Sequence, residues 1–271
     1  MQQEVPQLRF AATRLASGPK LHYAEQGDRG GEPIVFLPAY TDSWFSFSRV
    51  LPLLPPRYHA YAVDQRGHGD SERPACCYTV EDFAADTVAF LDGIGAERAT
   101  LVGHSGSCFV ARRVAEAHPE RVARLVLIGS PGSLGDNEEE LELQTAVQAL
   151  EDPVPVQFAR ELQGGATHVA LPEAFFERLV AESLKLPARV WKSALDGLFA
   201  FDDAADLGRI AAPTLLIWGE WDRWLPREEE DHLAVAIPGA TVIVYPATGH
   251  SPNWERPEMV AADLDAFMRQ T

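Results

Sequence analysis

The pentapeptide Gly103-His104-Ser105-Gly106-Ser107 stands between two stretches of different periodicity. Residues 99–102 form an apolar run typical of a buried strand, and residues 108–115 follow a helical pattern. Small residues let a chain turn sharply from a strand into a helix, and such a corner holds the serine hydroxyl above the sheet. The first N–H groups of the helix then face the place where an oxyanion would form. Ser105 is therefore the candidate nucleophile.

A serine hydroxyl is a weak nucleophile at neutral pH, so this chemistry also needs a histidine base and a carboxylate that orients it. The strand-like run 214–218 ends in a glycine turn, and two carboxylates follow it. Asp222 is favoured over the rival Glu220 because it lies farther into the loop, where open α/β sheets place their chemistry. Another strand-like run, 241–245, leads to His250, which we predict to be the base.

With Ser105, Asp222 and His250 in this order, each after its own strand, the chain resembles the α/β-hydrolase superfamily over nearly its whole length. Two further stretches match. Residues 36–44 are similar to the loop that supplies the second oxyanion-hole donor, and residues 64–71 are similar to the family's turn after the next strand.

The resemblance implies an oxyanion hole made by the backbone N–H groups of Gly106 and Tyr40. The chain departs from the family pattern twice. Pro38 and Ala39 stand where relatives usually show His-Gly, and Ser107 replaces the last glycine of the elbow. We interpret Ser107 as a tolerated variation, because serine is small.

Strand-like runs alternate with helix-length segments along the chain, which indicates a parallel sheet with right-handed crossovers. The predicted fold is α/β: a mostly parallel, doubly wound, eight-stranded sheet flanked by helices, with a helical cap inserted after the sixth strand. Seven of the strands are assigned to residues, at 20–25, 34–37, 59–63, 99–102, 125–128, 214–218 and 241–245, and the helices of the core are 44–53, 80–92, 107–118, 227–236 and 258–269.

The strand signal vanishes between residues 132 and 211. Four helical segments are expected there, over residues 137–150, 154–162, 172–184 and 188–198. The sequence therefore predicts a core of residues 1–131 and 212–271 and a cap of residues 132–211. Such an insertion at the carboxyl end of the sheet would cover the serine and shape a mostly apolar pocket.

Aromatic residues near the candidate triad are expected to contact the substrate. The candidates are Trp44 and Phe45, which follow the oxyanion loop, and Trp221 and Trp224, which flank Asp222. His104, inside the elbow, is added to this set. Aromatic residues of the predicted cap are expected to pack mainly against the cap itself.

Composition and charge are typical of a globular enzyme: the chain has 271 residues, 46% of them hydrophobic, and a formal net charge of −17. A negative charge repels nucleic-acid phosphates and anionic membranes, so neither is an expected partner. No apolar run approaches the roughly 18 residues of a membrane span. Residues 1–6 carry no signal-peptide pattern, and a cytoplasmic location is expected.

Three cysteines are an odd number, and Cys76 and Cys77 are adjacent. A strained vicinal bridge is conceivable, but we expect two reduced thiols in a loop. No spacing of cysteine and histidine suggests a metal, and the glycines of residues 67–69 do not continue into a nucleotide-binding pattern, so no cofactor is expected.

The function predicted from sequence is hydrolysis of small to medium, apolar carboxylic esters through an acyl-serine, with a small-molecule ester as the partner. A serine at the elbow, where an aspartate would stand, disfavours epoxide hydrolase and haloalkane dehalogenase chemistry. Lactonase, carbon-carbon bond hydrolase and cofactor-free perhydrolase or haloperoxidase activities use the same triad and stay open. A ligand receptor or signalling protein with slow turnover is the non-enzyme alternative. The oligomeric state is left open.

Overall fold

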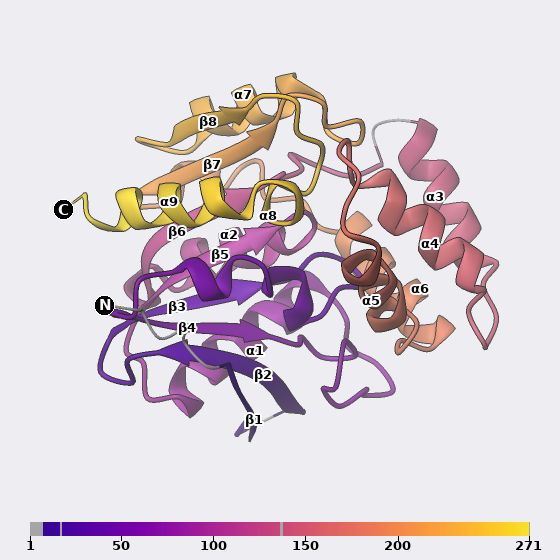
Figure 1. Cartoon of the computed structure of the whole chain (residues 1–271), viewed down its shortest axis with the longest axis horizontal. Helices are drawn as coiled ribbons and strands as arrows, with labels where there is room; N and C mark the ends of the chain where they lie inside the picture. Colours follow the sequence, from indigo (N-terminus) through magenta and orange to yellow (C-terminus); the bar gives the residue numbers. More distant parts are fainter. Residues whose placement is uncertain (1–7, 17, 136–137, 271) are drawn as a thin grey trace.

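The protein is described by a computed structural model, over residues 8–16, 18–135 and 138–270. Eight strands form a single sheet in the order β1-β2-β4-β3-β5-β6-β7-β8 (Figure 1). β1 and β2 pair antiparallel with each other, β2 pairs antiparallel with β4, and all the other pairs are parallel. The strands are β1 Arg9–Arg14, β2 Lys20–Gly27, β3 Glu32–Leu37, β4 Tyr58–Val63, β5 Ala99–His104, β6 Val122–Ile128, β7 Thr214–Gly219 and β8 Thr241–Tyr245.

This sheet confirms the predicted mostly parallel, eight-stranded α/β fold. Sequence analysis did not identify β1 (Arg9–Arg14). In this edge strand partly buried residues alternate with exposed ones, and both ends carry arginine, so its apolar signal is weak. The expectation for residues 1–6 lies outside the described residues.

Helices cover both faces of the sheet because alternate residues of each strand point to opposite sides. In β3, Val35 and Leu37 pack with the helices behind the sheet in Figure 1, whereas Ile34 and Phe36 pack with α9 in front of it. The helices behind are α1 Val80–Gly93 and α2 Ser107–Ala117; the one in front is α9 Pro257–Met268, and α7 Arg227–Ala236 packs against β7 and β8.

A continuous helix predicted over residues 44–53 is wrong. The structure has two short 3₁₀ turns, η1 Trp44–Phe47 and η2 Leu51–Leu53. Pro52 contributes to the break, because it lacks the N–H that a continuing helix would need. Ser43 begins the first turn by accepting a hydrogen bond from the N–H of Phe45.

In the part of the chain that the structure describes, four α-helices follow β6 and precede β7 in sequence, and they lie at one end of the sheet (Figure 1). They are α3 Glu138–Gln148, α4 Val156–Gly165, α5 Glu173–Ser183 and α6 Ala188–Phe199. Each begins within two residues of its predicted start. The predicted first residue of α3, Asn137, lies outside the described residues, as does its neighbour Asp136. We refer to α3–α6 as the inserted helices.

The structure corrects the expectation of two free thiols at residues 76 and 77. Cys76 and Cys77 are joined in a disulfide in an exposed loop. Cys77 has a left-handed backbone (φ 73°), a local geometry that sequence composition does not reveal. Cys108 is free and buried in α2.

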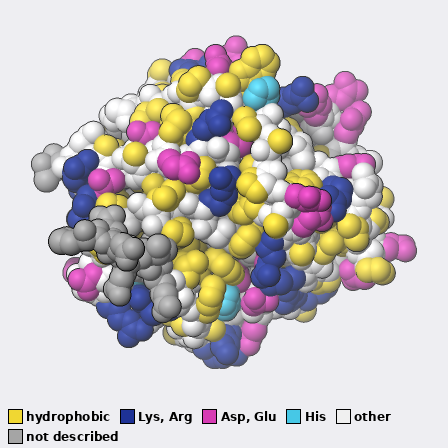
Figure 2. Space-filling model, viewed as in Figure 1, with side chains coloured by type: hydrophobic (Ala, Val, Ile, Leu, Met, Phe, Trp, Pro, Cys, Tyr) yellow, Lys and Arg dark blue, Asp and Glu magenta, His cyan; other side chains and the backbone are white. Residues whose placement is uncertain are grey.

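Lys and Arg side chains are interspersed with Asp and Glu on the face shown in Figure 2 and do not gather into one basic patch. No helix of the described chain is long and apolar enough to cross a membrane.

One buried ion pair connects the core to the chain that returns from the inserted helices. The guanidinium of Arg112, fully buried in α2, donates two hydrogen bonds to Asp203, at 2.7 and 2.8 Å. Arg112 also donates to Ser130 Oγ and to the carbonyl of Pro131, after β6. Glu116 lies beside this pair, and burial raises the pKa of its carboxyl to about 8. The arginine thus compensates the charge of a carboxylate that water does not reach.

Replacing Arg112 by methionine keeps the apolar stem but leaves Asp203 as an uncompensated buried carboxylate. We expect Arg112→Met to lower the free energy of unfolding by about 3–5 kcal/mol. The matched control is Arg209→Met, which breaks an exposed pair with Asp206 and should cost less than about 1 kcal/mol. Urea unfolding of the variants measures both, and equal losses would contradict this account.

Candidate active site

The loop from β5 to α2 holds Ser105 in a left-handed backbone conformation (φ 53°) that non-glycine residues seldom adopt. The N–H of Ser105 donates to the carbonyl of Ile128, at 2.9 Å, which fixes the corner against the neighbouring strand β6. Gly103 permits the close approach of α2, because a Cβ there would lie 2.8 Å from the carbonyl oxygen of Ser107. The corner predicted from sequence therefore aims the serine hydroxyl away from the strand.

His250 and Asp222 complete a chain of hydrogen-bonding groups with Ser105. His250 Nε2 lies 2.8 Å from Ser105 Oγ, and His250 Nδ1 lies 2.7 Å from Asp222 Oδ2. The second carboxylate oxygen of Asp222 accepts hydrogen bonds from the N–H groups of Trp224 and Leu225, at 2.9 and 3.0 Å. These donors fix the carboxylate so that its other oxygen, Oδ2, contacts the imidazole of His250.

The rival carboxylate, Glu220, lies elsewhere. Its Oε2 accepts a hydrogen bond from the N–H of Ala247, at 3.0 Å, and so connects the loop after β7 to the loop after β8. The structure thus brings Asp222, and not Glu220, to His250.

The loop after β3 brings Tyr40 to the cavity that Gly106 also lines. Within the described residues neither the N–H of Tyr40 nor that of Gly106 donates to a backbone oxygen. Thr41 has a left-handed backbone (φ 67°), and the N–H of Asp42 returns to the carbonyl of Ala39, which makes the loop a tight turn. The Tyr40 hydroxyl donates to the carbonyl of Trp191 in α6, at 2.8 Å, so its side chain joins the turn to the inserted helices.

Ser107 is a structural link rather than a neutral replacement for glycine. Its hydroxyl donates to the carbonyl of Pro38 and accepts a hydrogen bond from Gln65 Nε2, at 2.7 Å. Gln65 Nε2 also donates to Pro38, at 3.1 Å. The two departures from the family pattern, at residues 38 and 107, therefore meet and fix the Tyr40 turn to the elbow. Sequence reasoning missed this contact because nothing local pairs residues 38 and 107.

These groups open into a cavity of about 220 Å³ between the sheet and the inserted helices. Its wall is mainly apolar, and the described residues that line it include neither lysine nor arginine. Acidic groups are present at Asp42, Glu139 and Glu140. The residues that form the apolar wall are Ala39, Pro131, Leu134, Leu143, Leu162, Ala166, Leu195, Leu198, Phe199, Trp224, Leu225 and Trp254.

Residues 32–257 match the sequence family described as alpha/beta hydrolase fold. The chain belongs to this family. The non-heme haloperoxidase of Rhodococcus erythropolis is 30% identical over 276 residues, which cover 93% of this chain and 97% of that protein. The 2-hydroxy-6-oxononadienedioate/2-hydroxy-6-oxononatrienedioate hydrolase 2 of Pseudomonas putida is 27% identical, with 94% of both chains covered. The crystal structure of a hydrolase from Pseudomonas aeruginosa aligns with a TM-score of 0.83 and 26% identity, over 97% of this chain and 98% of that one.

Two of the five residues expected to contact a substrate line the cavity of this hydrolase. They are His104 and Trp224. The ring centroid of Trp224 lies 4.9 Å from that of His250. Burial, together with nearby His250, lowers the pKa of His104 to about 3, so this ring is uncharged at neutral pH.

The structure places the other three expected contacts outside the cavity wall. Trp44 packs in the core beneath β3 and β4, and the Phe45 ring contacts Phe175 of α5. Trp221 is 55% exposed and stacks on His168. These three residues lie next to the loops named in the prediction, but the side chains of neighbouring loop residues point in different directions.

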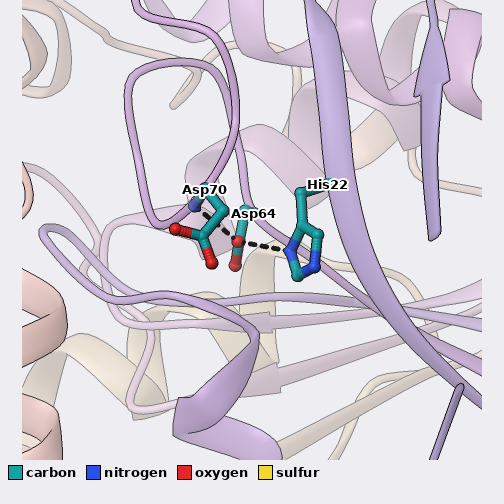
Figure 3. Close-up of side chains that lie close together, drawn as sticks. All are labelled: His22, Asp64 and Asp70. Carbon is teal, nitrogen blue, oxygen red and sulfur yellow. Dashed lines mark hydrogen bonds and ion pairs between the residues drawn. The ribbon is translucent and has the colours of Figure 1, made fainter. Parts of the chain in front are cut away.

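His22, Asp64 and Asp70 are grouped closely enough to suggest a cation site (Figure 3). Protein donors already use the central carboxylate: Asp64 accepts from the N–H groups of Trp44 and Asp70 and lies 2.8 Å from His22 Nδ1. Asp70 is exposed and pairs with Lys185. We interpret Asp64 as the fixed point of the turn at residues 64–71, the stretch that resembled the family pattern.

Glu230 is a fully buried carboxyl near Asp222, in the first turn of α7. One of its oxygens accepts from the N–H of Ser130, at 3.0 Å, and within the described chain the other has no partner. Burial raises the pKa of Glu230 to about 8, and the charge of Asp222 adds to the shift. Glu230 is thus mainly protonated near neutral pH and adds little negative charge next to Asp222.

Replacing Gly103 by alanine tests the close packing of the elbow. The new Cβ would lie 2.8 Å from Ser107 O and 2.9 Å from Cys108 Cα, which are backbone atoms that cannot move away cheaply. We expect a loss of about 1–3 kcal/mol of unfolding free energy in urea. Gly208→Ala is the control, since its Cβ meets nothing within 4 Å and should change stability by less than about 0.5 kcal/mol. Comparable stability of the two variants would show that the elbow has room to spare.

Glu230 also predicts a pH dependence of stability. Its folded pKa is raised from 4.5 to about 8, so the unfolded chain releases this proton at lower pH than the folded one. Stability is therefore lost as pH rises from about 4.5 to about 8. Glu230→Gln should raise unfolding free energy by roughly 1–3 kcal/mol at pH 8 and change it little at pH 4.5.

Urea unfolding at the two pH values measures this difference. Glu228→Gln, an exposed position on the same helix, serves as the control and should show no such dependence. A gain that is the same at both pH values would contradict the raised pKa.

Proposed function

We propose that this member of the family is a serine hydrolase of uncharged, largely apolar carboxylic esters, and that residues 132–211 form its cap over a core of residues 1–131 and 212–271. The observation that carries the proposal is the chain Ser105–His250–Asp222, with separations of 2.8 and 2.7 Å, at the floor of an apolar cavity. The geometry supports acyl transfer because nucleophile, base and orienting acid meet in hydrogen-bond order.

In the proposed reaction, His250 Nε2 takes the proton of Ser105 as Oγ attacks the ester carbonyl. Asp222 accepts the hydrogen bond of Nδ1–H and stabilises the imidazolium. The N–H groups of Tyr40 and Gly106 bind the oxyanion of the tetrahedral intermediate. The protonated His250 then gives its proton to the leaving alkoxide, and an acyl-serine results. His250 next takes a proton from water, whose oxygen attacks the acyl-serine. When this second tetrahedral intermediate collapses, the protonated His250 returns the proton to Ser105 Oγ and the carboxylic acid is released.

The charge of the cavity supports an uncharged substrate. Carboxyl groups of Asp42, Glu139 and Glu140 line it, and the described lining offers no cation to pair with a substrate carboxylate. An anionic substrate would therefore lose hydration without gaining an ion pair. This disfavours a substrate such as the dienedioate named for the Pseudomonas putida relative, which carries two carboxylates.

A second candidate is perhydrolysis, in which hydrogen peroxide replaces water at the acyl-serine. It is favoured by the 30% identity to the Rhodococcus erythropolis haloperoxidase across nearly both chains. The two candidates share every step up to the acyl-serine. A peroxide-dependent halogenation assay with a carboxylic acid present separates them.

The direct test is hydrolysis of p-nitrophenyl butyrate by the wild-type protein and by Ser105→Ala. Removing the nucleophile should lower kcat by on the order of 10³-fold or more. The control is Ser193→Ala, at an exposed serine of α6, which should keep the wild-type rate. Undiminished turnover by Ser105→Ala would refute the acyl-serine mechanism.

A further inference from the structure

The cavity lining includes polar groups that the proposed reaction does not use. Asp42 lines the cavity two residues after Tyr40, with only 3% of its surface exposed. Burial raises the pKa of its carboxyl to about 7. A carboxyl group is costly to bury in an apolar cavity, so its hydrogen-bonding partners need to be accounted for.

Protein donors hold Asp42 from two sides. Its Oδ1 accepts from Gln163 Nε2 of α4, at 3.0 Å, and its Oδ2 accepts from Ser46 Oγ of η1, at 2.8 Å. Ser46 is itself held by the indole N–H of Trp254, at 2.8 Å. The carboxylate is thus fixed between the core and the inserted helices. Two carboxylate oxygens offer about four acceptor positions, so acceptor capacity remains on this carboxylate.

Ser251 supplies a second polar group among the residues that line the cavity. It follows His250 directly, has no exposed surface and lines the cavity. Within the described part of the chain, its hydroxyl is a buried group without a hydrogen-bond partner. A buried hydroxyl left unsatisfied is destabilising, and such groups in native proteins usually serve a ligand or a water.

A purely structural role for Asp42 would be to tie α4 to the core through Gln163. That role accounts for the two hydrogen bonds, but it does not account for placing a buried carboxyl among the residues that line the cavity. It also leaves Ser251 Oγ unexplained. A ligand group that both donates and accepts would satisfy both residues.

We propose that Asp42 and Ser251 form a recognition site for a hydroxyl group on the ester substrate. The substrate hydroxyl donates to the Asp42 carboxylate and accepts from the Ser251 hydroxyl. Because Asp42 is close in sequence to the oxyanion donor Tyr40 and Ser251 adjoins His250, the hydroxyl must lie only a few bonds from the reacting carbonyl. The inference rests on the proposed ester hydrolysis and narrows its substrate class to hydroxy esters.

Two esters of nearly the same shape test the site: methyl 3-hydroxybutyrate and methyl 3-methylbutanoate, in which a methyl group replaces the hydroxyl. Binding is measured by NMR titration of the Ser105→Ala protein, which cannot turn the esters over by the proposed route. We expect the hydroxy ester to bind at least tenfold more tightly, because only it satisfies the two buried polar groups.

Adding Asp42→Asn or Ser251→Ala to this protein should reduce that preference by about tenfold or abolish it. Glu139→Gln is the matched control, since it removes a carboxylate from another part of the same cavity wall and should leave the preference intact. Equal binding of the two esters, or a preference that survives both variants, would overturn the recognition site.

The ratio of kcat/KM for the two esters, measured with Ser105 present, separates this inference from the proposed reaction. A binding preference without turnover of either ester would support the site and reject the reaction. Turnover of both esters with the same kcat/KM, unchanged by Asp42→Asn, would reject the site and leave the reaction standing.

Discussion

The left-handed backbone of Ser105 is a conformation that a side chain with a Cβ adopts only when its surroundings hold it there. Here the hydrogen bond from its N–H to Ile128 and the close contact of Gly103 with α2 hold the corner. The direction of the hydroxyl, the position of the Gly106 N–H and the start of α2 all follow from it. The hydrogen bond between His250 and Ser105 depends on where this corner holds the serine hydroxyl. The corner therefore constrains the rest of the site.

The same corner is joined through side chains to the turn of Tyr40, the second donor of the proposed oxyanion hole. Ser107 and Gln65 bind the carbonyl of Pro38, and this contact sets the turn that presents the N–H of Tyr40. Three loops that follow different parallel strands are thus joined at the carboxyl end of the sheet. A parallel sheet brings these ends together, but hydrogen bonds between the loops determine which groups face the cavity.

Burial also organises the charges around the site. His104 is kept neutral by its low pKa, and Glu230 is kept protonated by its raised pKa. Asp222, in contrast, accepts two backbone hydrogen bonds in addition to its contact with His250. In this site, protein N–H groups provide hydrogen bonds to the Asp222 carboxylate. Burial favours the neutral forms of the neighbouring groups, His104 and Glu230.

The residues that meet at the site, Ser105, Asp222 and His250, were readable from the sequence because each follows a recognisable strand. The strand order of a parallel sheet then brings these loops to one edge, so local patterns were sufficient to predict their meeting. The inserted helices were likewise visible as a long gap in the strand signal. The weak alternation of the edge strand β1 and the broken helix at residues 44–53 show where local pattern was inadequate.

Tertiary structure alone decided which loop side chains enter the cavity. Trp224 lines it while Trp221 points to solvent, although both flank Asp222 in the sequence. The place of Asp42 in the cavity wall likewise depends on its contacts with η1 and α4. The place of Ser251 depends on the turn that follows His250. Strand and helix periods fix the direction of side chains within an element, whereas the direction of a loop side chain depends on partners that are distant in sequence.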